Sequence, residues 1–295
     1  MSNDLSGFKR IELSFMNETR VVFRKGEGPA VIVMHEVPGL YPGVIRFANA
    51  LCDAGFTVWL PSLLGEPGKD VNPYYIASSM VRACVMREFT VFATSKNSAV
   101  TSWLRLLAKH ANNECGGAGV GAIGMCLTGG FALAMMVDGV VLAPVVCNPS
   151  LPFALSPTRK RDLGIDNETL AQAKARSVAD NICVLGLRFT ADIAVPKQRF
   201  QRLRDEFGDN FIALEINSAS GNPHGISRFA HSVLGLNYNA EPDHPTVEAE
   251  LQTINFLKER LISRMKSARI DPPLRKIDAN KKMSSTTSER RKLSS

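Results

Sequence analysis

The sequence has few of the features that mark membrane, secreted or metal-binding proteins. No stretch approaches the roughly 18 uncharged apolar residues that a membrane span requires. The N-terminal residues, MSNDLSGFKRIELSF, lack the basic-then-apolar pattern of a signal peptide. The six cysteines include no C-x-x-C pair, and their spacing suits neither a zinc site nor a disulfide framework. We therefore expect a cytoplasmic protein with no metal, no other cofactor and no membrane partner.

The excess of positive charge does not indicate a nucleic-acid partner either. The formal net charge is +7. Residues 271–295 hold seven basic and three acidic residues, a net of +4, which leaves +3 on the other 270 residues. The charge of these 270 residues is small enough that no polyanionic partner is required to explain it. We therefore expect no nucleic-acid partner.

The length and composition favour one large domain followed by a tail. The chain has 295 residues, of which 45% are hydrophobic, enough for a sizeable core. Residues 271–295 are rich in Ser, Lys and Arg and show no apolar periodicity, which predicts a disordered tail. We therefore assign residues 1–270 to a single folded domain.

Strand-like and helix-like segments alternate along this domain. Two β-type runs at 12–16 and 20–24 predict a hairpin or a pair of edge strands. Further strands are expected at 30–34, 56–60, 120–125, 140–145, 182–189 and 211–216. Helices are expected near 42–54, within 75–110, and at 129–137, 167–178, 196–207 and 246–266. This alternation predicts an α/β fold, with a mostly parallel sheet and helices on both faces. The irregular span 61–95 is either a cap over a site or an ordinary surface excursion.

A glycine pattern inside the domain does not indicate a dinucleotide site. Gly119, Gly121 and Gly124 spell G-x-G-x-x-G, but that motif requires a strand before its first glycine. Here Gly121 and Gly124 lie within the expected strand 120–125 itself, and Gly119 directly follows a loop. We therefore read the match as a coincidence.

A glycine-flanked cysteine follows this strand. The segment GMCLTGG at 124–130 lies between the expected strand and a helix, as in a nucleophile elbow, a strained turn that lifts the nucleophile above the sheet. Thr128 stands where the common pattern has glycine. At a helix N-terminus the backbone N–H groups favour a thiolate and an oxyanion. We therefore predict that Cys126 is a nucleophile, whereas most of the other cysteines are inert and buried.

A nucleophile of this kind needs a base and an acid that orients the base. Asp192 lies in the turn after the expected strand 182–189, and His224 and His231 follow the last strand. His224 stands in a loop with glycine and proline, whereas His231 stands among apolar residues at a spacing typical of a structural position. We therefore predict that His224 is the base and meets Asp192 at the carboxyl edge of the sheet.

These motifs resemble those of the dienelactone hydrolase family, which has the α/β-hydrolase fold. Four of them stand in the family order: MHEV at 34–37, G-x-C-L around Cys126, D-x-x-V-P from Asp192 and H-G from His224. They are spread over residues 30–265. Three features depart from the family pattern: Thr128 inside the elbow, the lack of a glycine just before Asp192, and a long helix-rich insertion at 73–110.

The resemblance implies further site residues. Glu36 would be an additional carboxylate that activates the thiol, and the backbone N–H groups of Val37 and Leu127 would form the oxyanion hole. Arg228 would hold a carboxylate of the substrate. The residues alone leave an alternative open for each of two positions. Glu36 could instead cap a loop, and Arg228 could be a solvated loop residue.

We expect, from these patterns, a cysteine hydrolase of a small ester or lactone, with anionic enol-lactones among the candidates. Cys126 would attack the carbonyl, His224 oriented by Asp192 would move protons, and water would release the acyl-enzyme. The alternative is a noncatalytic protein of the same fold that binds a small ligand or a partner in the same cleft.

Overall fold

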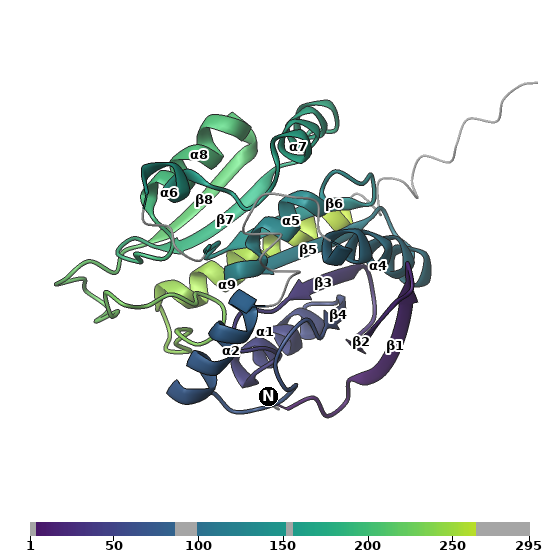
Figure 1. Cartoon of the computed structure of the whole chain (residues 1–295), viewed down its shortest axis with the longest axis horizontal. Coiled ribbons are helices and arrows are strands. Elements are labelled where there is room, and N and C mark those ends of the chain that lie inside the picture. Colours follow the sequence, from purple (N-terminus) through teal and green to yellow (C-terminus); the bar gives the residue numbers. More distant parts are fainter. Residues whose placement is uncertain (1–3, 86–98, 152–155, 264–295) are drawn as a thin grey trace, which may run out of the picture.

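A computed structural model describes residues 4–85, 99–151 and 156–263. These residues form one eight-stranded sheet with the strand order β1-β2-β4-β3-β5-β6-β7-β8 (Figure 1). The first three strands in this order pair antiparallel, and all later neighbours pair parallel. The predicted α/β class with a mostly parallel sheet is confirmed.

The strands fall close to their predicted positions. Their bounds are Lys9–Phe15 (β1), Glu18–Lys25 (β2), Ala30–Met34 (β3), Thr57–Pro61 (β4), Val120–Met125 (β5), Val141–Cys147 (β6), Val184–Phe189 (β7) and Phe211–Ile216 (β8). The first two form the predicted hairpin, in which Glu12 pairs with Val21. The β-branched run of β3 is wholly buried, as expected of a strand covered on both faces.

The longer helices also follow the predicted periodicity. Their bounds are Pro42–Asp53 (α1), Pro73–Val85 (α2), Ala99–Cys115 (α4), Gly129–Met135 (α5), Asn167–Ala179 (α7), Lys197–Phe207 (α8) and Pro245–Leu257 (α9). A short helix, Pro157–Arg161 (α6), was not predicted; the Ser156 hydroxyl caps it by accepting the N–H of Arg159. The predicted last helix, 246–266, corresponds to α9 and a π-helical turn at Lys258–Ser263.

Parts of the predictions lie outside the described residues. They are residues 264–295, which include the predicted tail 271–295 and the domain boundary at 270, and residues 86–98 of the insertion between α2 and α4. Within the described residues, no helix is both long and apolar enough to cross a membrane.

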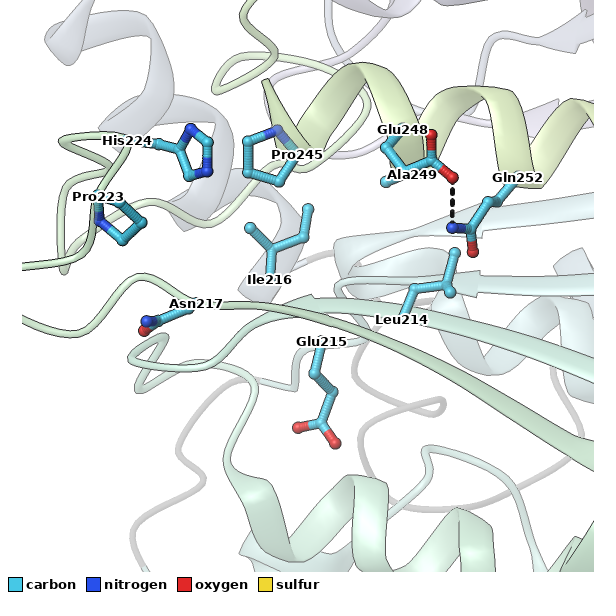
Figure 2. A pocket seen from close by; sticks show the side chains of 10 residues that line it. All are labelled: Leu214, Glu215, Ile216, Asn217, Pro223, His224, Pro245, Glu248, Ala249 and Gln252. Atoms are coloured by element: carbon cyan, nitrogen blue, oxygen red, sulfur yellow. Dashed lines mark hydrogen bonds between the residues drawn. The ribbon is translucent and has the colours of Figure 1, made fainter. Parts of the chain in front are cut away.

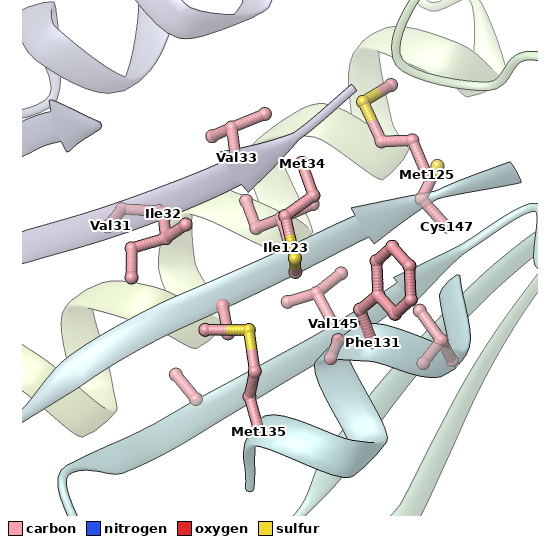
Figure 3. Close-up of a cluster of buried hydrophobic side chains, with 14 of the residues drawn as sticks. Val31, Ile32, Val33, Met34, Ile123, Met125, Phe131, Met135, Val145 and Cys147 are labelled. Atoms are coloured by element: carbon pink, nitrogen blue, oxygen red, sulfur yellow. The ribbon is translucent and has the colours of Figure 1, made fainter. Parts of the chain in front are cut away.

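The core is built around the three central strands. Side chains of β3, β5 and β6 pack against α5, with Ile123, Val145, Phe131 and Met135 fully buried (Figure 3). Helices α5 and α9 lie on opposite faces of the sheet (Figures 1 and 3). The core thereby fixes the carboxyl ends of β3, β5, β6, β7 and β8 at one edge, where the loops carry polar side chains.

Candidate active site

Strand β5 ends in a strained turn at Cys126. The backbone φ of Cys126 is +55°, a left-handed conformation that is costly for a residue with a side chain. A Cβ atom at Gly124 would collide with the carbonyl oxygen of Thr128, and one at Gly129 would lie 2.6 Å from Pro149 Cβ. The turn therefore has the geometry of the predicted nucleophile elbow, with glycine at two positions where a side chain does not fit.

Thr128, the residue that departs from the usual elbow, fastens the turn to the neighbouring strand. Its buried hydroxyl accepts the N–H of Met125 at 2.8 Å and lies 2.9 Å from the carbonyl oxygen of Met34, to which it can donate. Met34 is the last residue of β3 and precedes the loop that carries Glu36. The threonine thus ties the elbow to this loop.

Asp192 meets His231 at the predicted edge of the sheet. The Nδ1 atom of His231 lies 2.6 Å from Oδ2 of Asp192. Asp192 is buried, and its second oxygen accepts the N–H of Ala194 at 2.8 Å. The Asn237 side chain holds the histidine backbone, because its Oδ1 accepts the N–H groups of His231 and Ser232.

The electrostatics of His231 connect it to Cys126. Burial by itself would lower the pKa of His231, but electrostatic interactions and hydrogen bonds with Cys126 and Asp192 act in the opposite direction. Together they raise the pKa of His231 well above its usual value. The surroundings of His231 therefore favour its protonated form.

The predicted pairing of His224 with Asp192 is wrong, because His231 occupies that place. His224 is exposed and lines a cavity of about 310 Å³ between β8, α9 and the loop after β8 (Figure 2). Its ring lies 5.7 Å from that of His244. The lining of this cavity includes neither Cys126 nor Asp192.

A serine that no sequence motif indicates, Ser150, faces the sulfur of Cys126. The Oγ atom of Ser150 lies 2.8 Å from Sγ of Cys126, and the N–H of Ser150 donates to the carbonyl oxygen of Cys126 at 3.0 Å. Ser150 follows the end of β6, so Cys126 lies between the loop after β6, which carries Ser150, and the loop after β8, which carries His231. The only signal in the sequence that could have suggested Ser150 is its position in the loop after the strand that follows the elbow.

Glu36 is buried in the loop after β3 and is held by donors from three segments. Its Oε1 accepts the hydroxyls of Tyr41 and Ser232, and its Oε2 accepts Nδ2 of Asn148 at 3.1 Å. Burial and the charge of Glu36 raise the pKa of Tyr41 well above its usual value, so this hydroxyl stays a donor. Both carboxylate oxygens are thus engaged in the structure.

Gly235 provides the space for this carboxylate. A Cβ atom at Gly235 would lie 2.6 Å from Oε1 of Glu36 and 2.5 Å from Oγ of Ser232, and it would also collide with the Tyr41 hydroxyl. The backbone of residue 235 therefore forms one wall of the Glu36 pocket.

His35 locks the start of the same loop. Its Nε2 accepts the N–H of Leu63 at 3.0 Å, which leaves Nδ1 to donate to the carbonyl oxygen of Glu36 at 3.0 Å. Burial lowers the pKa of His35 to about 4, and the bond to Glu36 opposes this shift. His35 is therefore a neutral structural link between the loops after β3 and β4.

The remaining predicted site residues stand in the expected loops. Val37 is half-buried next to Glu36, and Leu127 is buried in the first turn after Cys126. Arg228 is exposed, with its guanidinium 5.4 Å from the centre of the Phe229 ring. Within residues 4–85, 99–151 and 156–263, no group of three His, Cys, Asp or Glu side chains is arranged to hold a metal.

The strand order, the elbow and the positions of the acid and histidine loops are those of an α/β hydrolase. Within that class the chain belongs to the dienelactone hydrolase family, which it matches over residues 18–261. No curated protein matches the chain in sequence.

Solved structures show the same fold. One is a protein of Klebsiella pneumoniae provisionally classed as a dienelactone hydrolase (TM-score 0.55, 16% identity, 85% of this chain and 98% of that one). A cold-adapted esterase from an Arctic intertidal metagenomic library is similar (TM-score 0.54, 14% identity, 86% and 94%). So is a dienelactone hydrolase-like promiscuous phosphotriesterase from metagenomic libraries (TM-score 0.52, 17% identity, 86% and 98%).

Proposed function

We propose that the protein hydrolyses small carboxylic esters or lactones by covalent catalysis at Cys126. The observation that supports this most is the convergence of three loops: the strained turn at Cys126 and the hydrogen-bonded pair of His231 and Asp192. A nucleophile beside a base that is itself oriented by an acid is the arrangement that acyl transfer requires.

In this proposal the thiolate of Cys126 attacks the carbonyl carbon and forms a carbon–sulfur bond. The ester C–O bond breaks, and the leaving oxygen takes the proton carried by His231. The neutral imidazole then removes a proton from a water molecule, which attacks the thioester. Collapse of this second intermediate releases the acid and restores the thiolate–imidazolium pair. Asp192 keeps Nδ1 protonated throughout, so that the other ring nitrogen does the proton transfer.

The negative oxygen of each intermediate needs two N–H donors. We assign them to the backbones of Val37 and Leu127, because each follows directly a residue of the site and lies at the same sheet edge. Thr128 supports this assignment, since it fastens the elbow to the strand that precedes Glu36 and Val37.

Glu36 is the second carboxylate of the site. As a base toward Cys126 it would have to leave Tyr41, Ser232 or Asn148, which hold both of its oxygens. We propose that His231 holds the thiol proton in the resting state. Glu36 acts as a base only toward the protonated thiol of Cys126, and only after one of these bonds opens. Arg228 is the proposed contact for substrates that carry a carboxylate, such as anionic enol-lactones.

The test is turnover of a panel of nitrophenyl esters and lactones, neutral and anionic, by wild type, Cys126→Ala and Cys126→Ser. We expect hydrolysis by wild type, a background rate with Cys126→Ala, and an intact-mass increase equal to the acyl group when wild type is quenched during turnover. A wild-type protein that binds these compounds but forms no acyl adduct would instead be the noncatalytic binding protein.

A further inference from the structure

Arg199 is a buried cation that lies behind the active site. It stands in the first turn of α8 and is only 1% exposed. Its guanidinium donates four hydrogen bonds, all to main-chain carbonyls: Asp162 (2.6 Å), Pro149 (2.9 Å), Ala194 (3.0 Å) and Arg159 (3.1 Å). A buried arginine usually has a carboxylate partner, because an uncompensated charge is costly in the protein interior. No carboxylate of the described residues forms an ion pair with Arg199.

Two of these carbonyls belong to the loops that hold the catalytic groups. Pro149 precedes Ser150, whose hydroxyl faces Sγ of Cys126. Ala194 donates its own N–H to the carboxylate of Asp192. Arg199 thus binds the residue that precedes Ser150, the contact of Cys126. It also binds Ala194, which itself contacts Asp192.

The charges around Arg199 are those of the same site. Burial lowers the pKa of Arg199 to about 10, while the negative charges of Asp162, Asp192 and Cys126 favour its protonated form. Arg199 therefore stays a cation at neutral pH. The anions that offset its charge lie at the end of α6, in the acid turn and at the elbow.

We infer that Arg199 is a positioning residue of this active site, which fixes the Asp192 turn against the Pro149–Ser150 turn and places a positive charge behind the thiolate of Cys126. This inference rests on the proposed function for its effect on turnover. Its effect on the reactivity of the sulfur does not depend on any substrate.

Arg188 offers a matched control. Its side chain is also buried and also binds the acid loop, through the carbonyl oxygen of Val195 at 2.7 Å. In contrast to Arg199, it is paired with the carboxylate of Glu215, at 2.8 Å, and so its charge is compensated locally. Arg188→Lys should therefore perturb the same loop without removing charge from behind Cys126.

The experiment compares Arg199→Met, Arg199→Lys and Arg188→Lys. It measures the rate of Cys126 alkylation by iodoacetamide from pH 5 to 10, mapped by peptide mass spectrometry, together with Tm, kcat and KM. With Arg199→Met we expect the midpoint of alkylation to rise by about one pH unit, and kcat to fall about 10- to 100-fold with a smaller change in KM. Arg199→Lys keeps the charge but cannot reach four carbonyls, so its kcat should fall about tenfold while the midpoint stays near that of wild type.

Arg188→Lys should lower Tm while leaving the alkylation profile unchanged. Arg199 variants with normal kcat and a wild-type alkylation profile, whatever their Tm, would overturn the inference and leave Arg199 a structural residue. Should Arg199→Met fail to fold, kcat of Arg199→Lys decides between a positioning role and a purely structural role of Arg199. A wild type that hydrolyses no ester would overturn the proposed function alone, because the alkylation profiles still test the role of Arg199.

Discussion

The Nδ1 atom of His231 lies 2.6 Å from Oδ2 of Asp192, although 39 positions separate the two residues in the chain. Strands β7 and β8 are parallel neighbours, and the loops that follow them therefore reach the same edge of the sheet. Of the two histidines that follow β8 in the predicted site, His231 is therefore the one beside Asp192.

His231→Ala should abolish ester hydrolysis, whereas His224→Ala should leave it within about twofold of wild type. Loss of the histidine of a triad costs on the order of 10³-fold or more in rate. His224 is exposed and lines a different cavity, so it serves as the matched control. Steady-state kinetics of both variants on one substrate suffice, and an essential His224 with a dispensable His231 would refute the assignment.

Cys126 should be the first cysteine to react with iodoacetamide at neutral pH. Burial raises the pKa of the Cys147 thiol well above its usual value and that of Cys52 to about 11. Cys126 instead has a cationic imidazole beside it, and the thiolate is the reactive form. Brief labelling followed by peptide mapping measures the order, and earlier modification of Cys52 or Cys115 would contradict the prediction.

Glu36→Gln should lower both turnover and stability. Tyr41, Ser232 and Asn148 all donate to the carboxylate, so an amide nitrogen in place of either oxygen would lose a charge-assisted hydrogen bond. We expect Tm to fall by several degrees and kcat by roughly 10²- to 10⁴-fold. Comparing kcat with Tm separates the two roles: an unchanged kcat with a lowered Tm would leave Glu36 purely structural.

Ser150→Ala should reduce kcat by roughly 10- to 100-fold, the effect of a lost hydrogen bond to a charged group. The alkylation rate of Cys126 should change as well, because the hydroxyl contacts the reacting sulfur. Ser156→Ala is a suitable comparison, since Ser156 is an exposed helix cap. Equal kcat values for the two variants would exclude a role of Ser150 in catalysis.

Acid should destabilise the fold through His35. Below pH 6.5 the unfolded chain takes up a proton at this histidine, whereas the folded chain does so only near pH 4. The free energy of unfolding should therefore fall as pH drops from 6.5 to 4, by up to about 3 kcal/mol from this group. Urea unfolding of wild type and His35→Gln at several pH values checks this, and parallel pH profiles would rule it out.

The parts of the site that local sequence determines could be predicted. The elbow depends on a few consecutive residues around Cys126, and Asp192 follows a strand whose buried run is plain in the sequence. The histidine could not be chosen in this way, because residues 217–244 form no helix or strand. The path of this loop depends on bonds such as those of Asn237, which only the folded chain brings together.

The apolar spacing around His231 was misleading for a related reason. It predicted a structural histidine on a buried face, but Phe229 is 78% exposed and residues 233–237 form turns. Ser150 and Arg199 carried no local signal at all. Both residues matter because of the segments that they join in the fold, and hydrophobic periodicity does not predict contacts between distant segments.

The space at Gly235 has a use in comparing relatives of this chain. A side chain there would intrude on the hydroxyls that hold Glu36, whereas Gly139 has open space around its Cα and no such constraint. Within the family, the residue aligned with Gly235 thus distinguishes two groups of sequences. Those with a residue larger than glycine must hold the carboxylate aligned with Glu36 by other contacts. Sorting relatives by this residue would divide the family by the architecture of its second carboxylate before any further structure is solved.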